Sequence, residues 1–381
     1  MSRKPDVDVL VLGGGCAGLS VAARLAGCSG TDLSVRILEP REQYENDRTW
    51  CFWGTAGHRF SGQVRHRWKA WLFSTAQSSW TQVSKNGISY QSIAADDFYA
   101  STLQSIEQSD RIELSLGTEA NAIDPGADRV NVETNRGPVT ARWVIDTRPA
   151  RGQDEAPGFA QVFSGAEVET EAERFDPETA GLMSHMSCDS NGFRFTYVLP
   201  FSKRRALVEE TRFTAAADRS LLESGLEHSL EQMSDGSAYR VVRRETGRIP
   251  MSTRPSPQTA SDRIFAAGLG GGAARPATGY AFSRIQRWAE DCAQRVRTGR
   301  PPAGHPPDPA WRRFADGLFL RVIEEQPEMA PDLFLALGRR VPPATLVRFL
   351  SDEGRLRDFA RVAMALPKRP FLARLGTAAA A

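Results

Sequence analysis

A glycine-rich turn between an apolar strand and a helix is the feature of this chain that most constrains its fold. An alternating apolar run covers Val7 to Leu12, and a helical run covers Leu19 to Leu25. Three glycines lie between these runs in a G-x-G-x-x-G pattern: Gly13, Gly15 and Gly18. In this pattern the first glycine allows a tight turn, the second lets the backbone approach a pyrophosphate, and the third lets the helix pack on the strand. With phosphates at the helix N-terminus, the segment predicts a dinucleotide-binding unit.

An acidic residue closes the next apolar run. That run covers Leu33 to Leu38, and Glu39 ends it about 20 residues after the last glycine, where a carboxylate can accept hydrogen bonds from ribose hydroxyls. Strand, glycine turn, helix and acid in this order are much more specific than the glycine pattern alone, whose alternative interpretation is a chance glycine-rich turn.

Composition narrows the class of protein. The 381 residues are 41% hydrophobic, enough for a sizeable core and about two compact units. Because 48 basic and 46 acidic residues give a net charge of only +2, we expect no nucleic-acid partner. The chain shows no apolar signal region and no run of the ~18 to 20 apolar residues that spans a bilayer, so we expect a cytoplasmic protein whose membrane contact, if any, is peripheral.

Cysteine usage points to a reducing compartment. The five cysteines are scattered and form no Cys-x-x-Cys pair: Cys16, Cys28, Cys51, Cys188 and Cys292. We therefore expect neither a disulfide framework nor a metal site.

Strand patterns indicate two interleaved layers. The apolar runs Arg142–Asp146 and Arg263–Ala267 are typical of buried parallel strands that complete the nucleotide-binding sheet. Between them, Phe193–Leu199 and Ala206–Thr211 alternate in character around a Pro-Phe-Ser-Lys-Arg turn, which predicts antiparallel strands of a second domain.

The expected fold is α/β: a Rossmann-like nucleotide-binding domain, an interleaved antiparallel-sheet substrate domain and a helical C-terminal region. Four helical patterns follow a proline-rich stretch: Trp311–Glu325, Ala330–Leu337, Pro343–Leu350 and Arg357–Ala365. The expected boundaries are 1–75, 130–150 and 240–300 for the nucleotide-binding domain, 76–129 and 151–239 for the substrate domain, and 301–381 for the helical region.

A second glycine-rich loop has cofactor-binding character. The segment GLGGGAARPATGY carries five glycines, from Gly268 to Gly279, between a strand and the helical run Tyr280–Arg297. Its bare N–H groups can face an anionic or polar ring edge. The alternative is a flexible surface loop.

These segments, with several others, carry a family resemblance. They include LVLGGGCAGLS, ENDRTWCFW, WVIDTRP, FDPETAGLM, FRFTYVLPFSKRRALVEET, Glu245 with GRIPM, ARPATGYAFSRIQRW and ALPKRPFL. Nearly from end to end, the chain resembles the flavin-dependent lycopene β-cyclases of carotenoid-making bacteria. The resemblance implies a fold akin to flavoprotein hydroxylases and non-covalent FAD in its reduced form, with NADPH as a possible electron source. It also implies a redox-neutral reaction, of intramolecular lyase or isomerase type, that closes a β-ionone ring on lycopene or a related carotenoid.

Ring closure requires an acid that protonates an alkene, and burial can keep a carboxyl neutral for this purpose. Glu209 and Glu210 are adjacent on a predicted strand, so they point to opposite faces. By resemblance Glu209 is the catalytic acid/base and Glu210 the less favoured candidate; the alternative is a solvated charge pair. A reduced, electron-rich flavin would stabilise the cation electrostatically.

Other positions have two interpretations each. Trp50, Phe52 and Trp53 can give aromatic faces to a polyene and its cation, or can pack in the core. Arg48 is a candidate for flavin contact, and Asp146 for cofactor contact or helix capping.

The C-terminal helices are rich in arginine among apolar residues, as expected for helices that rest on an anionic bilayer; the alternative is an amphipathic cap over the core. The basic residues are Arg339, Arg340, Arg348, Arg355, Arg357, Arg361, Lys368, Arg369 and Arg374.

One segment departs from the family pattern. Where the family has Leu-Met-Asp-Phe-Arg, this chain has Leu182-Met183-Ser184-His185-Met186. The change leaves open the carotenoid, the number of ends closed and activity itself, and makes His185 a candidate for proton handling. The alternatives to a cyclase are therefore an FAD-dependent monooxygenase or halogenase of the same fold, and an inactive carotenoid-binding homologue. The sequence carries no signal for oligomeric state.

Overall fold

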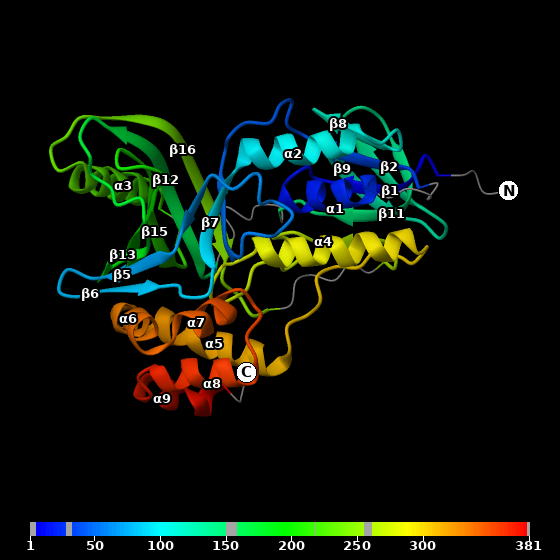
Figure 1. Cartoon of the computed structure of the whole chain (residues 1–381). Helices are drawn as coiled ribbons and strands as arrows, with labels where there is room; N and C mark the ends of the chain where they lie inside the picture. Colours follow the sequence, from blue (N-terminus) through cyan, green and yellow to red (C-terminus); the bar gives the residue numbers. More distant parts are fainter. Residues whose placement is uncertain (1–4, 28–32, 150–157, 217, 255–260, 379–381) are drawn as a thin grey trace.

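Two sheets lie side by side with a group of helices packed beneath one of them (Figure 1). The structure, a computed structural model, describes residues 5–27, 33–149, 158–216, 218–254 and 261–378. Within them the fold is mixed α/β with a helical C-terminal region, as expected.

The first sheet is the predicted nucleotide-binding layer. Its strand order is β8-β2-β1-β11-β10-β9, and β17 pairs with β11. The strands are β1 (Val7–Leu12), β2 (Val35–Glu39), β8 (Ile112–Leu116), β9 (Ala120–Pro125), β10 (Val130–Thr134), β11 (Val139–Asp146) and β17 (Ile264–Ala266). Because β1 runs parallel to β2 and β11, and β11 parallel to β17, the predicted parallel strands are confirmed.

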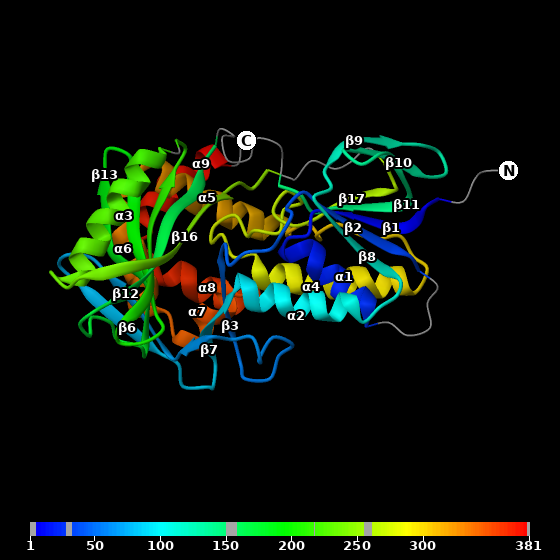
Figure 2. The ribbon, with the colours of Figure 1, turned by 90° about the horizontal axis from the view of Figure 1, so that it is seen from above.

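Three helices cover one face of the first sheet. They are α1 (Cys16–Ala26), α2 (Ala95–Glu107) and α4 (Phe282–Arg297), which lie beside one another in the view from above (Figure 2). Their apolar sides and the strands bury Leu19, Phe98 and Trp288. The helix after the glycine turn is therefore anchored from both sides.

The second sheet contains the predicted antiparallel pair. Its order is β16-β12-β15-β14-β13-β5-β6, and β14 pairs antiparallel with β15 as expected. The strands are β5 (Ala70–Ser74), β6 (Ser79–Val83), β12 (Ala160–Thr170), β13 (Thr179–Asp189), β14 (Gly192–Pro200), β15 (Arg205–Thr214) and β16 (Tyr239–Pro250). Helix α3 (Arg219–Ser234) packs on one face. A small sheet of β3 (Thr49–Gly54), β7 (Ser89–Ala94) and β4 (His66–Trp68) lies between the layers.

Strand pairing differs from the expected domain boundaries in both directions. β8 and β9, inside the range expected for the substrate domain, pair in the first sheet. β5 and β16, inside ranges expected for the nucleotide-binding domain, pair in the second sheet. We therefore propose boundaries that follow sheet membership, because hydrogen-bond pairing between distant strands leaves no trace in local periodicity.

The C-terminal region matches the four predicted helices and adds a fifth α-helix and a short 3₁₀ helix among the described residues. The helices are α5 (Ala310–Glu325), the short 3₁₀ helix η1 (Pro327–Met329), α6 (Ala330–Arg340), α7 (Pro343–Leu350), α8 (Leu356–Ala365) and α9 (Arg369–Ala378). α9 has a proline at its second position, where a missing N–H costs nothing.

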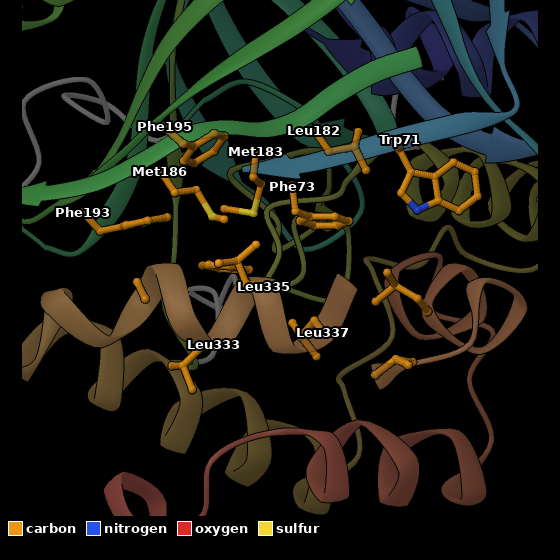
Figure 3. Packing of buried hydrophobic residues seen from close by; sticks show 14 of the residues in the cluster. Trp71, Phe73, Leu182, Met183, Met186, Phe193, Phe195, Leu333, Leu335 and Leu337 are labelled. Atoms are coloured by element: carbon orange, nitrogen blue, oxygen red, sulfur yellow. The ribbon is translucent and has the colours of Figure 1, made fainter. Parts of the chain in front are cut away.

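Helix α6 caps the second sheet on the face opposite α3. Phe334 stacks on Phe193 with ring centroids 5.4 Å apart, and Gln82 Nε2 donates to the carbonyls of Gly338 and Val341 at 2.7 Å. Methionine and phenylalanine side chains fill the space between sheet and helix (Figure 3). For α6, the interpretation as an amphipathic cap over the core is correct.

Candidate active site

The first glycine turn is tightly packed at Gly18 and open at Gly15. Gly13 adopts a φ of +92°, a left-handed conformation that favours glycine. A Cβ at Gly18 would lie 1.9 Å from the carbonyl oxygen of Gly13, so helix and turn pack at glycine distance. By contrast, a Cβ at Gly15 would meet nothing within 4 Å. The turn thus presents open space at its middle glycine, beside the start of α1.

Glu39 is occupied by protein groups in this structure. Its Oε2 accepts from the backbone N–H of Gly14 at 2.6 Å, and its Oε1 accepts from Arg41 Nε at 2.8 Å. Burial opposes ionisation of Glu39, but hydrogen bonds from Arg41 and Gly14 outweigh it and hold the pKa below its usual range. Tyr44 donates to the Gly14 carbonyl at 3.0 Å. Arg41 and Tyr44 are neighbours of the turn that sequence reasoning missed.

Two predicted cofactor residues lie near this turn in ion pairs. Arg48 pairs with Asp47 at 2.9 Å and keeps 54% of its side chain exposed. Asp146, at the end of β11, accepts from the backbone N–H and Nε of Arg148 at 3.1 and 2.9 Å. The helix-cap interpretation of Asp146 is wrong, since the described chain after β11 enters no helix up to residue 149.

The second glycine loop is packed and anchored. Gly268 and Gly279 have φ values of +65° and +70°, and no residue from Gly268 to Tyr280 is exposed. The Gly268 N–H donates to His305 Nε2 at 3.1 Å. These contacts disagree with a flexible surface loop.

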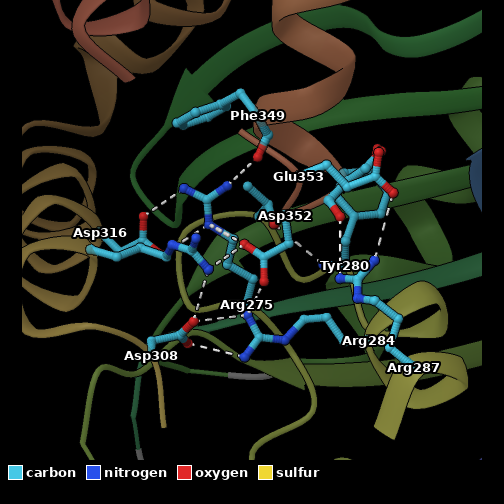
Figure 4. Close-up of polar contacts among 12 residues, drawn as sticks. Arg275, Tyr280, Arg284, Arg287, Asp308, Asp316, Phe349, Asp352 and Glu353 are labelled. Carbon is cyan, nitrogen blue, oxygen red and sulfur yellow. Dashed lines mark hydrogen bonds and ion pairs between the residues drawn. The ribbon is translucent and has the colours of Figure 1, made fainter. Parts of the chain in front are cut away.

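Buried ion pairs tie this loop to the C-terminal helices (Figure 4). Arg275 is fully buried and pairs with Asp316 of α5 at 2.9 Å. Arg284 of α4 pairs with Asp308 at 3.0 Å and with Asp352 at 2.6 Å. The helical region therefore fixes the position of the loop as well as capping the second sheet.

Strand β3 forms a wall between the two layers, and its side chains alternate between them. Trp50 and Phe52 face the first sheet's helices, where Phe52 stacks on Phe282 with centroids 4.8 Å apart. Trp53 faces the second sheet and lies 4.5 Å from the ring of Tyr90. For Trp50 and Phe52 the core interpretation is supported, whereas Trp53 borders the face that carries Glu209.

Glu209 and Glu210 point to opposite faces of β15, as predicted. Glu210 is fully buried beneath α3, where it pairs with Arg194 at 2.8 Å and where a Cβ at Gly225 would approach its Cγ to 2.9 Å. It is a structural ion-pair residue, separated by the sheet from the face that carries Glu209. We therefore propose a structural role for Glu210 instead of acid/base work.

Glu209 lies on the apolar face, between Leu207 and Phe213 of the core that α6 covers. Its side chain is 8% exposed. Burial raises the pKa of Glu209 well above its ordinary value, and the charge and hydrogen bond of Glu245 raise it further. Burial and the neighbouring carboxyl of Glu245 thus both favour the protonated form of Glu209.

The neighbours of Glu209 come from strands distant in sequence. Glu245 of β16 lies across Gly165 of β12, and Tyr197 of β14 is the cross-strand partner on the other side. Tyr197 hydrogen-bonds to Tyr90 of the small sheet. Burial raises the pKa of both phenols well above the ordinary value, so they remain neutral. Glu245 was noted only as part of a matching segment, because nothing local marks it as a partner of Glu209.

A cleft of about 660 Å³ opens beside this cluster. Its lining is mainly polar: Asn46, Thr49, Arg65, Ser92, Ala94, Asp96, Glu167, Phe201, Ser202, Arg205 and Arg243. Thr49 Oγ1 donates to Glu245 Oε2 at 3.1 Å, so a residue of the cleft lining contacts Glu245. Asn46 Oδ1 and Ser92 Oγ are buried without a hydrogen-bond partner among the described residues. Asn46 of the cleft lining follows Tyr44 closely in the sequence, and Tyr44 contacts Gly14 of the glycine turn.

The segment that departs from the family pattern lies away from Glu209. Ser184 is buried in an irregular stretch of β13 and pairs with Thr196, whose hydroxyl hydrogen-bonds to Ser229 of α3 at 3.2 Å. His185 is exposed, with a φ of +54°. Partial burial and the charge of Arg194 lower the pKa of His185. The neighbours of His185, Ser184 and Arg194, lie on the face of the sheet that α3 covers, whereas Glu209 lies on the other face. The structure therefore gives no support to proton handling by His185 at Glu209.

Two further expectations concern disulfide bonds and membrane-spanning helices. Cys16, Cys51, Cys188 and Cys292 are unbonded, and Cys28 lies outside the described residues. No helix in the described ranges is long and apolar enough to cross a membrane.

The chain is similar to known proteins both in sequence and in fold. Residues 8–375 match the family described as lycopene cyclase protein. The lycopene beta-cyclase of Pseudescherichia vulneris is 23% identical over 95% of each chain. Among solved structures, a geranylgeranyl bacteriochlorophyll reductase-like protein from Thermoplasma acidophilum covers 97% of this chain and 98% of its own, with 12% identity and a TM-score of 0.61. Aklavinone-11 hydroxylase, solved with FAD and aklavinone, covers 91% of this chain and 70% of its own at 13% identity and a TM-score of 0.57. The fold is therefore that of flavoprotein hydroxylases, as predicted.

Proposed function

The chain belongs to the lycopene cyclase protein family, and from this premise we propose that it is a lycopene β-cyclase. It closes the acyclic ends of lycopene or a related carotenoid into β-ionone rings. The observation that carries the proposal is Glu209, a buried carboxyl with a raised pKa on the apolar face of the second sheet. A neutral buried acid is what protonation of an isolated alkene needs.

The proposed reaction is balanced in atoms and electrons. Glu209 gives its proton to the terminal alkene of the carotenoid, which forms a C–H bond and leaves a tertiary carbocation. A second alkene of the same chain attacks this cation, so the ring closes and the positive charge moves to the new ring. A carboxylate of the site then takes a proton from the ring carbon and restores the double bond. The product is an isomer of the substrate, and no electron is gained or lost.

FAD is the cofactor that the glycine segments fit. The open space at Gly15 borders backbone N–H groups at the start of α1, where an anionic pyrophosphate is favoured. Gly268 lies against Thr147 and Ala17 beside this turn. We assign Gly279, Glu39, Arg48 and Asp146 to the same cofactor as further candidate contacts. The unpartnered Asn46 Oδ1 and Ser92 Oγ in the polar cleft suit the hydrogen-bonding edge of a flavin better than a polyene. Reduced flavin, with NADPH as a possible electron source, would supply negative charge near the cation.

Production of pigment in bacteria that accumulate lycopene tests the proposal. Wild-type protein is expected to change red cells to orange-yellow, with β-carotene on chromatography. Glu209→Gln keeps the shape of the side chain and removes its proton, so cyclisation should fall by at least ~100-fold, the lower range of general-acid effects. Glu210→Gln is the matched control, because Glu210 is equally buried on the opposite face.

Three outcomes decide between the alternatives. Unchanged lycopene with wild-type protein would favour the inactive carotenoid-binding homologue. NADPH oxidation that depends on added carotenoid would favour a monooxygenase or halogenase, whose fold this chain shares. Full activity of Glu209→Gln would move the acid elsewhere.

We also propose that helices α8 and α9 contact the cytoplasmic surface of an anionic bilayer. The apolar substrate resides inside that bilayer. Leu356, Met364 and Leu372 are exposed by 69%, 64% and 62%, and the same helices carry the exposed basic residues Arg357, Arg361 and Arg369. Apolar residues that insert at the interface, together with basic charge, are typical of peripheral binding. Sedimentation with vesicles of anionic phospholipid should pull down the wild type and lose Leu356→Ser/Met364→Ser. Val241→Ser/Val242→Ser, at exposed positions of β16, is the control. Equal sedimentation of both double variants would contradict membrane contact by these helices.

A further inference from the structure

Two buried carboxyl groups meet over a glycine in the second sheet. We propose that Glu245 is the positioning partner of Glu209: the two side chains share one proton across Gly165, and Arg243 holds the negative charge on Glu245. The role rests on the proposed cyclase function, which it deepens by assigning the group that controls the acid.

Strand register brings the pair together. Gly165 of β12 is the cross-strand partner of Glu209 on one side and of Glu245 on the other. Side chains directly opposite one another point to the same face of a sheet. A Cβ at position 165 would lie only 2.7 Å from Glu209 Cγ. The absent side chain of Gly165 therefore leaves the space in which the two carboxyl groups approach.

The contact between the carboxyl groups of Glu209 and Glu245 requires one proton. Glu209 and Glu245 are 8% and 6% exposed, and both point from positions opposite Gly165 to the same face of the sheet. Two carboxylates accept hydrogen bonds but cannot donate one, so this contact needs a protonated member. Two like charges in an apolar setting also disfavour each other. The pair thus carries a single negative charge in its resting form.

The surroundings place that charge on Glu245. Its Oε2 accepts from Thr49 Oγ1 at 3.1 Å and from Arg243. Arg243 also donates to Thr49 and, through Nε, to Glu167 Oε2 at 2.7 Å, so three contacts fix its orientation. No hydrogen bond or ion pair within the described residues joins Glu209 to a cation. Glu209 is therefore left as the proton carrier, on the side of the apolar core.

The shared site of Glu209 and Glu245 explains how Glu209 regains its proton after each turnover. When Glu209 gives its proton to the alkene, the pair becomes doubly negative and faces the new carbocation, with Arg243 as the compensating charge. The proton removed after ring closure returns to the pair, so each turnover leaves it with one proton.

The phenols and the thiol around the pair resist ionisation. Tyr197 of β14, Tyr90 of β7 and Cys51 of β3 have pKa values raised well above the ordinary, first by burial. On the other side, Glu167 is paired with Arg243 and Arg205. The alkaline limb of a pH–activity profile should therefore report loss of the Glu209 proton.

Two substitutions should move this limb in opposite directions. Glu245→Gln removes a charge and a hydrogen bond that raise the pKa of Glu209. Its limb should shift to lower pH by roughly one unit or more, the size of effect that a charge at close range produces. Arg243→Gln removes a charge that lowers the same pKa, so its limb should shift to higher pH. Glu245→Asp should restore part of the wild-type profile.

Glu210→Gln serves as the matched control. It removes an equally buried carboxyl from the adjacent position on the opposite face, so stability should fall while the limb stays in place. An unmoved limb in Glu245→Gln, with Glu209→Gln inactive, would overturn the shared proton while leaving the cyclase proposal intact. An inactive wild type would instead overturn the cyclase proposal.

Infrared spectroscopy tests the pair without turnover. The wild type with its flavin bound should show the absorption of a buried protonated carboxyl at neutral pH. The band should be lost in Glu209→Gln, and should disappear at lower pH in Glu245→Gln than in the wild type. A band that Glu209→Gln leaves unchanged would overturn the assignment, whatever the activity data show.

Discussion

Gly165→Ala adds one methyl group at the point where the two glutamates meet. The new Cβ would lie 2.7 Å from Glu209 Cγ and 3.2 Å from its Oε1. Carbon atoms pack at about 3.5 to 4.0 Å, so the Glu209 side chain must move by roughly 1 Å. The φ of Gly165 lies outside the left-handed region, so alanine can adopt the same backbone. The substitution is therefore a steric test of side-chain position.

The expected effect on activity is much larger than the effect on folding. Misplacement of a reacting group by about 1 Å can cost ~100-fold in rate, and we expect a loss of that order in cyclisation. Overpacking of a core site costs about 1–3 kcal/mol, so the variant should still fold. The assay is β-carotene formed per amount of flavin-loaded protein, beside a thermal melt.

Gly225→Ala is the matched control for this experiment. Its Cβ would lie 2.9 Å from Glu210 Cγ, which gives a similar clash with the other glutamate on the opposite face. We expect comparable or smaller destabilisation and near-normal cyclisation. The reasoning would be refuted by Gly165→Ala activity within about threefold of wild type, or by an equal loss in Gly225→Ala.

Three further predictions concern the cofactor turn and the buried ionic groups. Gly15→Ala should fold normally but lose flavin absorbance on purification, because its Cβ fills the open space beside the turn. Gly18→Ala should lose stability as well, because its Cβ clashes with the Gly13 carbonyl. Equal flavin content in Gly15→Ala and wild type would contradict phosphate binding at Gly15. Asp316→Ala leaves the fully buried Arg275 without its closest ion-pair partner and should cost about 3 kcal/mol in denaturant unfolding, while a loss under ~1 kcal/mol would argue against a role in anchoring the loop. Burial and Arg284 lower the pKa of His305 from 6.5 to about 3, so stability from the neutral ring is complete above pH ~6.5 and declines as the pH falls toward 3. Over that window the wild type should lose on the order of 4 kcal/mol more than His305→Gln, and parallel pH–stability curves would count against a neutral His305.

Local patterns in the sequence determined the parts of this protein that depend on neighbouring residues. The glycine turn, the parallel strands around it and the β14–β15 hairpin were all predictable, because each depends on contacts within a few residues or on simple periodicity. The opposite orientation of Glu209 and Glu210 followed from the two-residue repeat of a strand alone.

Tertiary structure decided which of these side chains has a chemical partner. Glu245 meets Glu209 only because β16 and β15 flank Gly165 in matching register. The assignment of β5, β8, β9 and β16 to their sheets was likewise a matter of long-range pairing. Register between strands separated by tens of residues is set by core packing and hydrogen bonding of the whole sheet, and no single segment contains that information.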